Sequence, residues 1–335
     1  MPLTERKVKV TIVGFDQALS SAITGALDLF ALAGVSWQRI HGQPVEPLFD
    51  VSIAGLHGSP FSCTNQLSIS PHCALEDVQH TDLLIVPTIG GDIAQVLKQN
   101  QRLLTYLQRH ASQQTDIAGN CTGTFLLAAA GLLENRIATT HWGYADTFRR
   151  MFPGVLLQPE KMLTQQDNLF CAGGGMAWFD LSLLLIRRYC GHQVATDTAK
   201  SLVLDLTRPN QTVYASTRQR KFHQDPDILA VQTSLEEAIA APLSLPALAS
   251  RHNMTVRTLL RRFQKACGQT PLKYLQALRV EYVMAQLETR KLPLESLLHE
   301  VGYEDVSSFS RLFKRQTGMS PAQYRAKFTA GDVQK

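Results

Sequence analysis

Residues 263–274 read FQKACGQTPLKY and residues 313–324 read FKRQTGMSPAQY, so one pattern of Phe, Gly, Thr or Ser, Pro and Tyr occurs twice, 50 residues apart. A Leu-x-x-Leu pair precedes each copy at nearly the same offset. Glycine suits the end of a helix, and proline suits the first turn of the next one. The repeat therefore predicts two copies of a short helix, a turn, a second helix and the start of a third.

The second helix of each copy is predicted to begin after a capping residue, Thr255 or Asp305. In each copy two apolar side chains four residues apart face a core, while basic and hydroxyl side chains occupy the remaining face. Short basic helices of this kind suit insertion into the major groove of DNA. The predicted DNA-binding residues are Val256, Arg257, Thr258, Arg261 and Arg262 in the first copy, and Ser307, Ser308, Ser310, Arg311 and Lys314 in the second.

The charge of the chain is distributed unevenly. The formal net charge is +5, and residues 229–335 hold 15 Lys and Arg against 9 Asp and Glu, whereas residues 1–228 hold 18 against 19. A polyanionic partner such as double-stranded DNA fits this asymmetry. A helical bundle whose basic residues are merely solvated is the alternative, and the duplication of the whole pattern speaks against it.

Residues 229–328 resemble the DNA-binding domain of the AraC/XylS family. The second copy carries most of that signature, as VGY at 301–303, SFSRLFK at 308–314 and TGMSP followed by YR at 317–325. The resemblance implies a transcription regulator, more often an activator, that binds a promoter operator and acts with RNA polymerase. Leu298 departs from the family pattern, which usually has Ala at that helix contact.

The first 200 residues alternate short apolar segments with helical patterns. This alternation predicts an α/β domain, a flavodoxin-like parallel sheet with helices on both faces, followed by an all-α domain with two helix-turn-helix units. The predicted strands are 8–13, 50–54, 83–87 and 115–119, with shorter ones at 137–140, 154–157 and 169–172; the predicted helices are 19–33, 93–110, 124–133, 178–189 and 194–206. The expected domains are 1–208 and 228–330, joined by a linker at 209–227.

A cysteine stands where a predicted strand meets a predicted helix, in the sequence GNCTG at 119–123. This is the arrangement of a nucleophile elbow, with Cys121 in place of serine. A helix N-terminus is expected to stabilise a thiolate there. Gly90 and Gly91 are expected to offer backbone N–H groups to an anion, and His141 is expected to lie beside the cysteine.

The chain from about 8 to 205 resembles the class I glutamine-amidotransferase-like domain of PfpI-type proteins, on Cys121-Thr122-Gly123 through Thr140-His141-Trp142. Enzymes of that superfamily pair the cysteine with an acidic residue on the first helix, where this chain has Ala22. We therefore expect a ligand-sensing domain and not an enzyme. The expected ligand-binding residues are Gly90, Gly91, Cys121, Thr122, His141 and Trp142.

Two other functions of the elbow remain open. One is a PfpI-like cysteine hydrolase or lyase fused to a DNA-binding domain, and the other is a redox or covalent thiol sensor at Cys121. The expected effector is a small nitrogenous metabolite, an amino acid or amine, by analogy with related regulators. A nucleoid-associated protein without sequence preference is a third, weaker class.

The six cysteines are scattered, without metal-type pairing, and suggest reduced thiols in a cytoplasmic protein. No cofactor and no metal is expected. No apolar stretch is long enough for a membrane span, and the N-terminal residues do not resemble a signal peptide. We expect a homodimer formed through the N-terminal domain.

Overall fold

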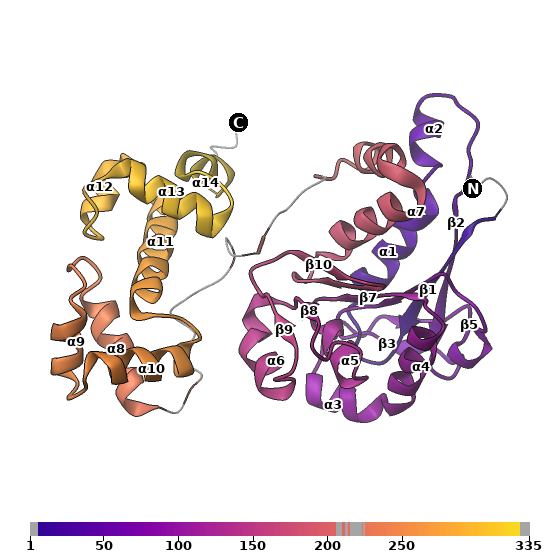
Figure 1. Ribbon diagram of the computed structural model, residues 1–335. Coiled ribbons are helices and arrows are strands. Elements are labelled where there is room, and N and C mark those ends of the chain that lie inside the picture. Colours follow the sequence, from indigo (N-terminus) through magenta and orange to yellow (C-terminus); the bar gives the residue numbers. More distant parts are fainter. Residues whose placement is uncertain (1–5, 206–209, 212–213, 215–222, 224, 329–335) are drawn as a thin grey trace. The chain divides into compact units, whose positions relative to one another are not determined.

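Short apolar runs in the first half of the chain form a seven-stranded sheet in the order β10-β11-β7-β6-β1-β2-β5 (Figure 1). The computed structural model describes residues 6–205, 210–211, 214, 223 and 225–328. Neighbouring strands are parallel except for the antiparallel pair of β10 and β11. The strands are β1 (Val8–Gly14), β2 (Phe49–Gly55), β5 (Cys73–Ala74), β6 (Leu83–Val86), β7 (Asp116–Asn120), β10 (Leu163–Gln166) and β11 (Leu169–Ala172).

Helices cover both faces of the sheet. Helices α1 and α7 pack together on one face, and α5 packs with α3 and α4 on the other (Figure 1). Parallel strands need crossover connections, and helices in those connections bury both faces of the sheet, which explains why its strands are almost continuously apolar. The predicted flavodoxin-like α/β fold is confirmed. The helices are α1 (Ser20–Leu32), α2 (Ser36–Ile40), α3 (Ile93–Gln99), α4 (Gln101–Ser112), α5 (Thr124–Ala129), α6 (Ala145–Met151) and α7 (Trp178–Ser201), with single 3-10 turns at Leu75–Asp77, Cys121–Gly123 and Trp142–Tyr144.

One predicted helix is divided in the structure, and a predicted pair of helices is present with a kink between them. The helix predicted over 93–110 is divided at Asn100, whose backbone leaves the helical region and whose side-chain amide donates to a carbonyl one turn earlier (2.8 Å). The two helices predicted near the end of the domain are present as the two parts of α7, which meet at a kink at Gly191 (φ 87°), between the predicted helices. The competing hydrogen bond of Asn100, which apolar periodicity does not register, explains the division of the helix predicted over 93–110.

Several short strands were not predicted. Strand β10 carries polar residues on its more exposed positions, and it pairs with β11 through a tight turn at Asp167 (φ 55°). Two further two-stranded sheets lie outside the main sheet. Their strands are β3 (Phe61–Ser62), β4 (Ser68–Ile69), β8 (Ile137–Ala138) and β9 (Leu156–Leu157). Strands β8 and β9 lie within the predicted strands 137–140 and 154–157, whereas β3 and β4 were not predicted, because two-residue strands leave no periodic signal in a sequence.

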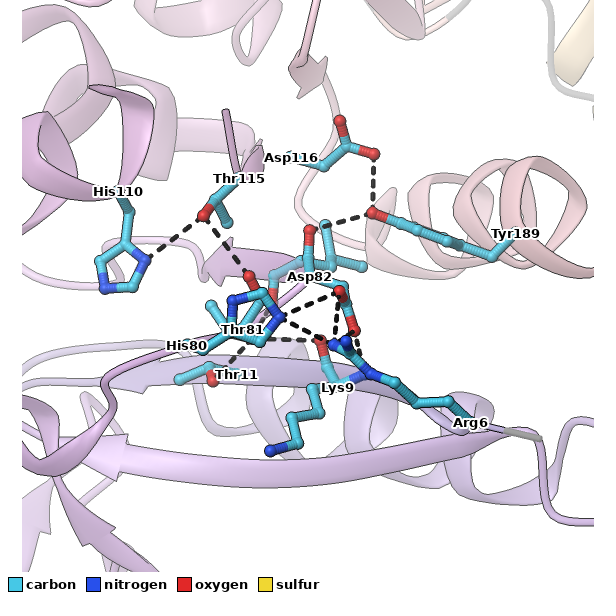
Figure 2. Close-up of polar contacts among 11 residues, drawn as sticks. Arg6, Lys9, Thr11, His80, Thr81, Asp82, His110, Thr115, Asp116 and Tyr189 are labelled. Atoms are coloured by element: carbon cyan, nitrogen blue, oxygen red, sulfur yellow. Dashed lines mark hydrogen bonds and ion pairs between the residues drawn. The ribbon is translucent and has the colours of Figure 1, made fainter. Parts of the chain in front are cut away.

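Ion pairs and hydrogen bonds occupy the amino-terminal end of the parallel strands (Figure 2). Asp82 accepts the backbone N–H of Lys9 (2.8 Å), and Asp116 accepts hydrogen bonds from Arg188 Nε (2.6 Å) and the Tyr189 hydroxyl (2.7 Å). These groups tie β1, β6, β7 and α7 together. Ligands of such sheets bind at the opposite, carboxyl end of the strands, and the elbow at Cys121 follows the carboxyl end of β7.

Every described element of the C-terminal unit is a helix, as predicted. The helices are α8 (Pro226–Glu237), α9 (Leu245–Arg251), α10 (Val256–Cys267), α11 (Pro271–Thr289), α12 (Leu294–His299), α13 (Val306–Thr317) and α14 (Pro321–Phe328). Two small apolar cores form, one around α10 and one around α13, with α11 contributing to both. The predicted repeat is thus two helix-turn-helix units that share one long helix.

The predicted caps of both second helices are confirmed. Thr255 accepts the N–H of Thr258 at the start of α10, and Asp305 accepts the N–H of Ser307 at the start of α13. Each helix ends at a glycine in the left-handed region, where a residue without Cβ is favoured. The matched caps explain why both copies place their exposed residues alike.

The chain divides into two units, Met1–Gln211 and Thr212–Lys335. Most of the predicted linker, 209–227, lies outside the described residues. Its assignment is wrong at Gln211, because that side chain is buried in the first unit (1 % exposed) and donates to the Thr140 carbonyl (2.7 Å). It is also too long at the other end, because α8 begins at Pro226. Among the described helices, none has the length and apolarity needed to cross a lipid bilayer.

Candidate functional sites

The chain turns sharply at Cys121, between β7 and α5. Its φ angle is +55°, which is uncommon for a residue with a side chain and indicates a constrained backbone. The Thr140 hydroxyl holds the turn by donating to the Cys121 carbonyl (2.8 Å), and the Thr122 hydroxyl donates to the Ile89 carbonyl (2.7 Å). A Cβ at Gly123 would lie 2.3 Å from the Pro87 carbonyl oxygen, so only glycine fits there. The predicted elbow geometry is present.

The thiol of Cys121 does not have the expected acidity. Its side chain is buried (3 % exposed), and burial raises the pKa of the thiol to about 11 in spite of hydrogen bonds from Thr122 and Thr88. The expectation of a stabilised thiolate is therefore wrong. The cysteine begins a single 3-10 turn, and α5 starts only at Thr124, so the helix dipole is short while desolvation is nearly complete.

The backbone N–H groups of Gly90 and Gly91 are already bonded. Both donate to the Gln17 carbonyl, at 2.8 and 3.3 Å. The expectation that they present free N–H groups to an anion is therefore wrong. Their lack of a side chain serves packing instead, because a Cβ at Gly90 would lie 2.5 Å from a methyl group of Thr64.

His141 and Trp142 stack beside the elbow, with ring centroids 5.3 Å apart. His141 Nδ1 accepts the N–H of Gly143 (3.0 Å), and burial lowers the pKa of the ring below its ordinary value. A neutral ring that accepts at Nδ1 carries its proton on Nε2. His141 is therefore an uncharged donor, placed next to the elbow through the bond between Thr140 and Cys121.

Two polar residues join this region that sequence reasoning missed. Asn120 donates to the Thr88 hydroxyl (2.7 Å) and to the carbonyl of Gly175 (3.3 Å), which brings the glycine loop against the elbow. Its Oδ1 atom is buried and has no hydrogen-bond partner among the described residues. Gln211 accepts the N–H of Trp142 (3.1 Å). The position of Asn120 before the cysteine was a usable signal, whereas nothing in the sequence marked Gln211.

The position where the sequence comparison expects an acidic partner for the cysteine holds an alanine without acid or base. Ala22 is buried in α1. With a neutral histidine and a protonated thiol, the groups of the elbow carry no charge near neutral pH. Within the described part of the chain, no cluster of three or more His, Cys, Asp and Glu side chains has the arrangement of a metal site.

In the C-terminal unit, α10 and α13 bury matching aromatic and aliphatic residues and expose the opposite face. Leu259 and Phe263 of α10, and Phe309 and Phe313 of α13, are fully buried. The predicted DNA-binding residues Arg257, Arg261, Ser307, Ser308, Arg311 and Lys314 are exposed, and Val256, Thr258, Arg262 and Ser310 are partly exposed. Both helices thus present basic or hydroxyl side chains to solvent.

Arg262 differs from the other arginines of α10. Its guanidinium bonds both oxygens of Asp225 (3.0 and 2.5 Å) and lies 2.8 Å from the carboxylate of Asp227. The ion pair holds the pKa of Asp225 below its usual range. Asp225 caps α8, so Arg262 fastens the start of α8 to α10. Its grouping with the DNA-binding residues rested on helix periodicity, which contains no information about a partner 37 residues away.

Comparisons with known proteins agree with this two-part organisation. Residues 8–184 match the model of the DJ-1/PfpI family, and residues 248–327 match a helix-turn-helix domain. A protein named HTH-type transcriptional regulator CdhR, from Pseudomonas aeruginosa, is 29 % identical over 282 residues, which cover 83 % of this chain and 82 % of the relative. The similarity therefore extends over both units.

Two further proteins match a little over half of this chain. Isonitrile hydratase from Pseudomonas putida is 30 % identical over 193 residues, covering 56 % of this chain and 82 % of the hydratase. The structure of Drosophila melanogaster DJ-1beta superposes with a TM-score of 0.51 and 18 % identity, covering 60 % of this chain and all of the other. The chain therefore belongs to the DJ-1/PfpI family, with an AraC-type helix-turn-helix domain following the α/β domain.

Proposed function

We propose that the chain is a sequence-specific DNA-binding transcription regulator whose activity is set by a small molecule bound at the Cys121 elbow. The observation that carries the proposal is the pair of matching helices α10 and α13. Both are capped in the same way, and both expose basic and hydroxyl residues. CdhR, which matches both units, is named a transcriptional regulator. The α/β unit would sense the effector, and the helical unit would bind the operator.

The two recognition helices would enter successive major grooves on one face of the DNA, about 34 Å apart. Arg257 and Arg261, one turn apart on α10, would contact base edges in the first groove. Ser307, Ser310 and Arg311 would do so in the second. Arginine is suited to this because its guanidinium bonds guanine through two parallel hydrogen bonds.

The difference between Arg261 and Arg262 gives a direct test. After selection of a binding site from random duplexes, Arg261→Ala should weaken binding of the full chain to that site by about 1–3 kcal/mol, and to random DNA by less. Arg262→Ala is the matched control: it should lower the melting temperature, because the contact with Asp225 is lost, and leave the ratio of specific to random binding unchanged. Equal losses for Arg261→Ala on both kinds of DNA would show a phosphate contact and refute base reading.

The elbow would bind its effector without turning it over. Ala22 supplies no acid or base, and the buried thiol of Cys121 has a pKa of about 11, so the pair needed for general acid–base work is missing. The unpartnered Oδ1 of Asn120 would accept an N–H group, which supports an amino acid or amine as the effector. A thermal-shift screen of amino acids and amines finds the effector, because binding to the folded state alone raises the melting temperature.

Cys121 variants separate binding from thiol chemistry. Cys121→Trp should remove the thermal shift, because the bulky ring fills the site, and Cys121→Ser should keep it. If Cys121→Ser also removes the shift, the thiol itself reacts, and a covalent sensor or an enzyme replaces this proposal. A turnover assay on the same compounds, including isonitriles, should show no product.

The remaining parts of the proposal concern assembly. The regulator would be a homodimer joined through the α/β unit and would activate transcription by contacting RNA polymerase at promoters in the bacterial cytoplasm. CdhR, which matches both units, comes from a bacterium, and the DNA of a bacterium lies in the cytoplasm. Sedimentation of the full chain measures the oligomeric state, and transcription in vitro from a promoter with the selected site measures activation.

A further inference from the structure

An arginine is buried in the middle of α11, the helix that both helix-turn-helix units share. Arg279 is 9 % exposed, and its guanidinium donates to the carbonyls of Ile239 (Nε, 2.8 Å) and Ala241 (Nη2, 2.7 Å). These carbonyls belong to the loop between α8 and α9, which is part of the first helix-turn-helix unit. A buried guanidinium without such acceptors would be strongly destabilising, so the loop and the arginine stabilise each other.

The same guanidinium also contacts the second helix-turn-helix unit. Its carbon atom lies 5.3 Å from the centre of the Tyr303 ring, in the turn between α12 and α13. Tyr303 in turn packs edge-to-face on Phe309, a buried residue of the recognition helix α13 (5.0 Å). Contacts of arginine with an aromatic face are attractive, and more so when both groups are shielded from water. Arg279 therefore connects the first helix-turn-helix unit to the second recognition helix through the Tyr303 ring.

The two turns approach each other closely at this point. A Cβ on Gly302, which has a φ of +69°, would lie 1.9 Å from the Ala240 carbonyl oxygen. Ile239 is the residue whose side chain packs against both apolar cores. The loop 239–241 thus contacts Arg279 and, closely, the turn of the second helix-turn-helix unit at Gly302.

We propose that Arg279 is a positioning residue that fixes the orientation of the second helix-turn-helix unit relative to the first, and with it the spacing of the two DNA half-sites that the chain accepts. The inference rests on the proposed two-groove binding. Exposed residues of α10 and α13 would contact the bases of each half-site, and Arg279 is not one of these residues. Arg279 acts through Tyr303 and the loop 239–241, and it touches no DNA.

Binding measurements on spaced duplexes test this inference in the full chain. The selected site is rebuilt with one base pair removed or one or two added between the half-sites, and each half-site is also offered alone. One base pair turns the second half-site by about 35° and moves it by about 3.4 Å, so wild type should bind best at the selected spacing. The variant Arg279→Met keeps the length of the side chain and removes its charge and hydrogen bonds.

Arg279→Met should bind the selected spacing about tenfold more weakly, bind the altered spacings within about threefold of that value, and keep the affinity for each half-site alone. The spacing profile is the affinity plotted against the number of base pairs between the half-sites. Tyr303→Leu should flatten this profile in the same way, while Arg279 keeps its carbonyl partners. Arg290→Met is the matched control: this arginine lies at the end of the same helix, but it bonds Gln286 and Glu300, so the profile should stay sharp.

A sharp profile for both Arg279→Met and Tyr303→Leu would overturn the inference and leave two-groove binding intact. A loss of half-site binding equal to the loss on the full site would also overturn it, because it would show general damage to the fold. A flat profile in wild type would refute two-groove binding itself. Melting curves identify a variant that does not fold, and Tyr303→Leu then decides between the outcomes.

Discussion

At the scale of single residues, burial decides what Cys121 does. The turn at φ +55° places the thiol where a nucleophile would stand, but the pKa of about 11 leaves it protonated near neutral pH. A protonated thiol is a weak nucleophile and a poor metal ligand. No charged group among the described residues lowers the pKa of this thiol, so it lacks the activation that a nucleophilic cysteine needs.

Thiol labelling measures this directly. With a pKa of about 11, only about one thiol in a thousand is ionised at pH 8, so Cys121 should react with iodoacetamide very slowly and about tenfold faster for each added pH unit. Peptide mass spectrometry follows the labelled residue, and Cys121→Ser identifies its signal. Rapid labelling of Cys121 at pH 7 would contradict the protonated state and support a redox sensor.

His110 is a second residue whose protonation depends on burial. Its side chain is fully buried on α4 beside the Thr115 hydroxyl, and burial lowers the pKa of the ring to about 4 (Figure 2). Between this value and the ordinary 6.5 the unfolded chain binds a proton that the folded chain excludes. Stability should therefore be highest above pH 6.5 and fall as the pH drops toward 4, by about 3 kcal/mol at most.

The variant His110→Gln removes this titration. Denaturant unfolding between pH 7 and 4 should give a shallower loss of stability for His110→Gln than for wild type. His192→Gln, at an exposed position of α7, should keep the wild-type slope. Parallel curves for wild type and His110→Gln would show that another group causes the acid sensitivity.

At the scale of elements, a glycine in the left-handed conformation ends the recognition helix α10. Helix α10 ends at Gly268 with φ +69°, and nothing lies within 4 Å of a Cβ built there. Gly268→Ala should therefore destabilise the helical unit by about 1 kcal/mol through backbone strain alone. Gly268→Asn should cost less, because asparagine tolerates the left-handed region. Thermal unfolding measures both, and equal effects would show that the backbone conformation is not the cause.

At the scale of the whole molecule, charge separates the two units. The excess of Lys and Arg lies after residue 228. The affinity of the full chain for duplex DNA should fall with salt, with about −0.9 added to the slope of log K against log salt for each phosphate contact, and more than about three contacts in total. A salt titration of binding measures the slope. A flat response would exclude the proposed DNA interface.

The amino-acid sequence by itself determined what depends on local pattern. Repeated caps, glycine stops and apolar spacing determined both helix-turn-helix units, and α11 begins at Pro271, where the repeat predicts the start of a third helix. Alternating apolar runs fixed the α/β fold, because strands buried on both faces must be apolar throughout. The turn at Cys121 was also readable, because glycine and a small polar residue surround it in the sequence.

Only the tertiary structure decided which polar groups are already engaged. The N–H groups of Gly90 and Gly91 bond to Gln17, Arg262 bonds to Asp225, and Arg279 bonds to the loop 239–241. Each partner is distant in sequence, and hydrogen bonds and desolvation depend on atoms within a few ångströms, whatever their separation along the chain. The same reason explains the pKa of Cys121: a sequence shows the turn that holds the thiol, and only the folded chain shows how completely water is excluded from it.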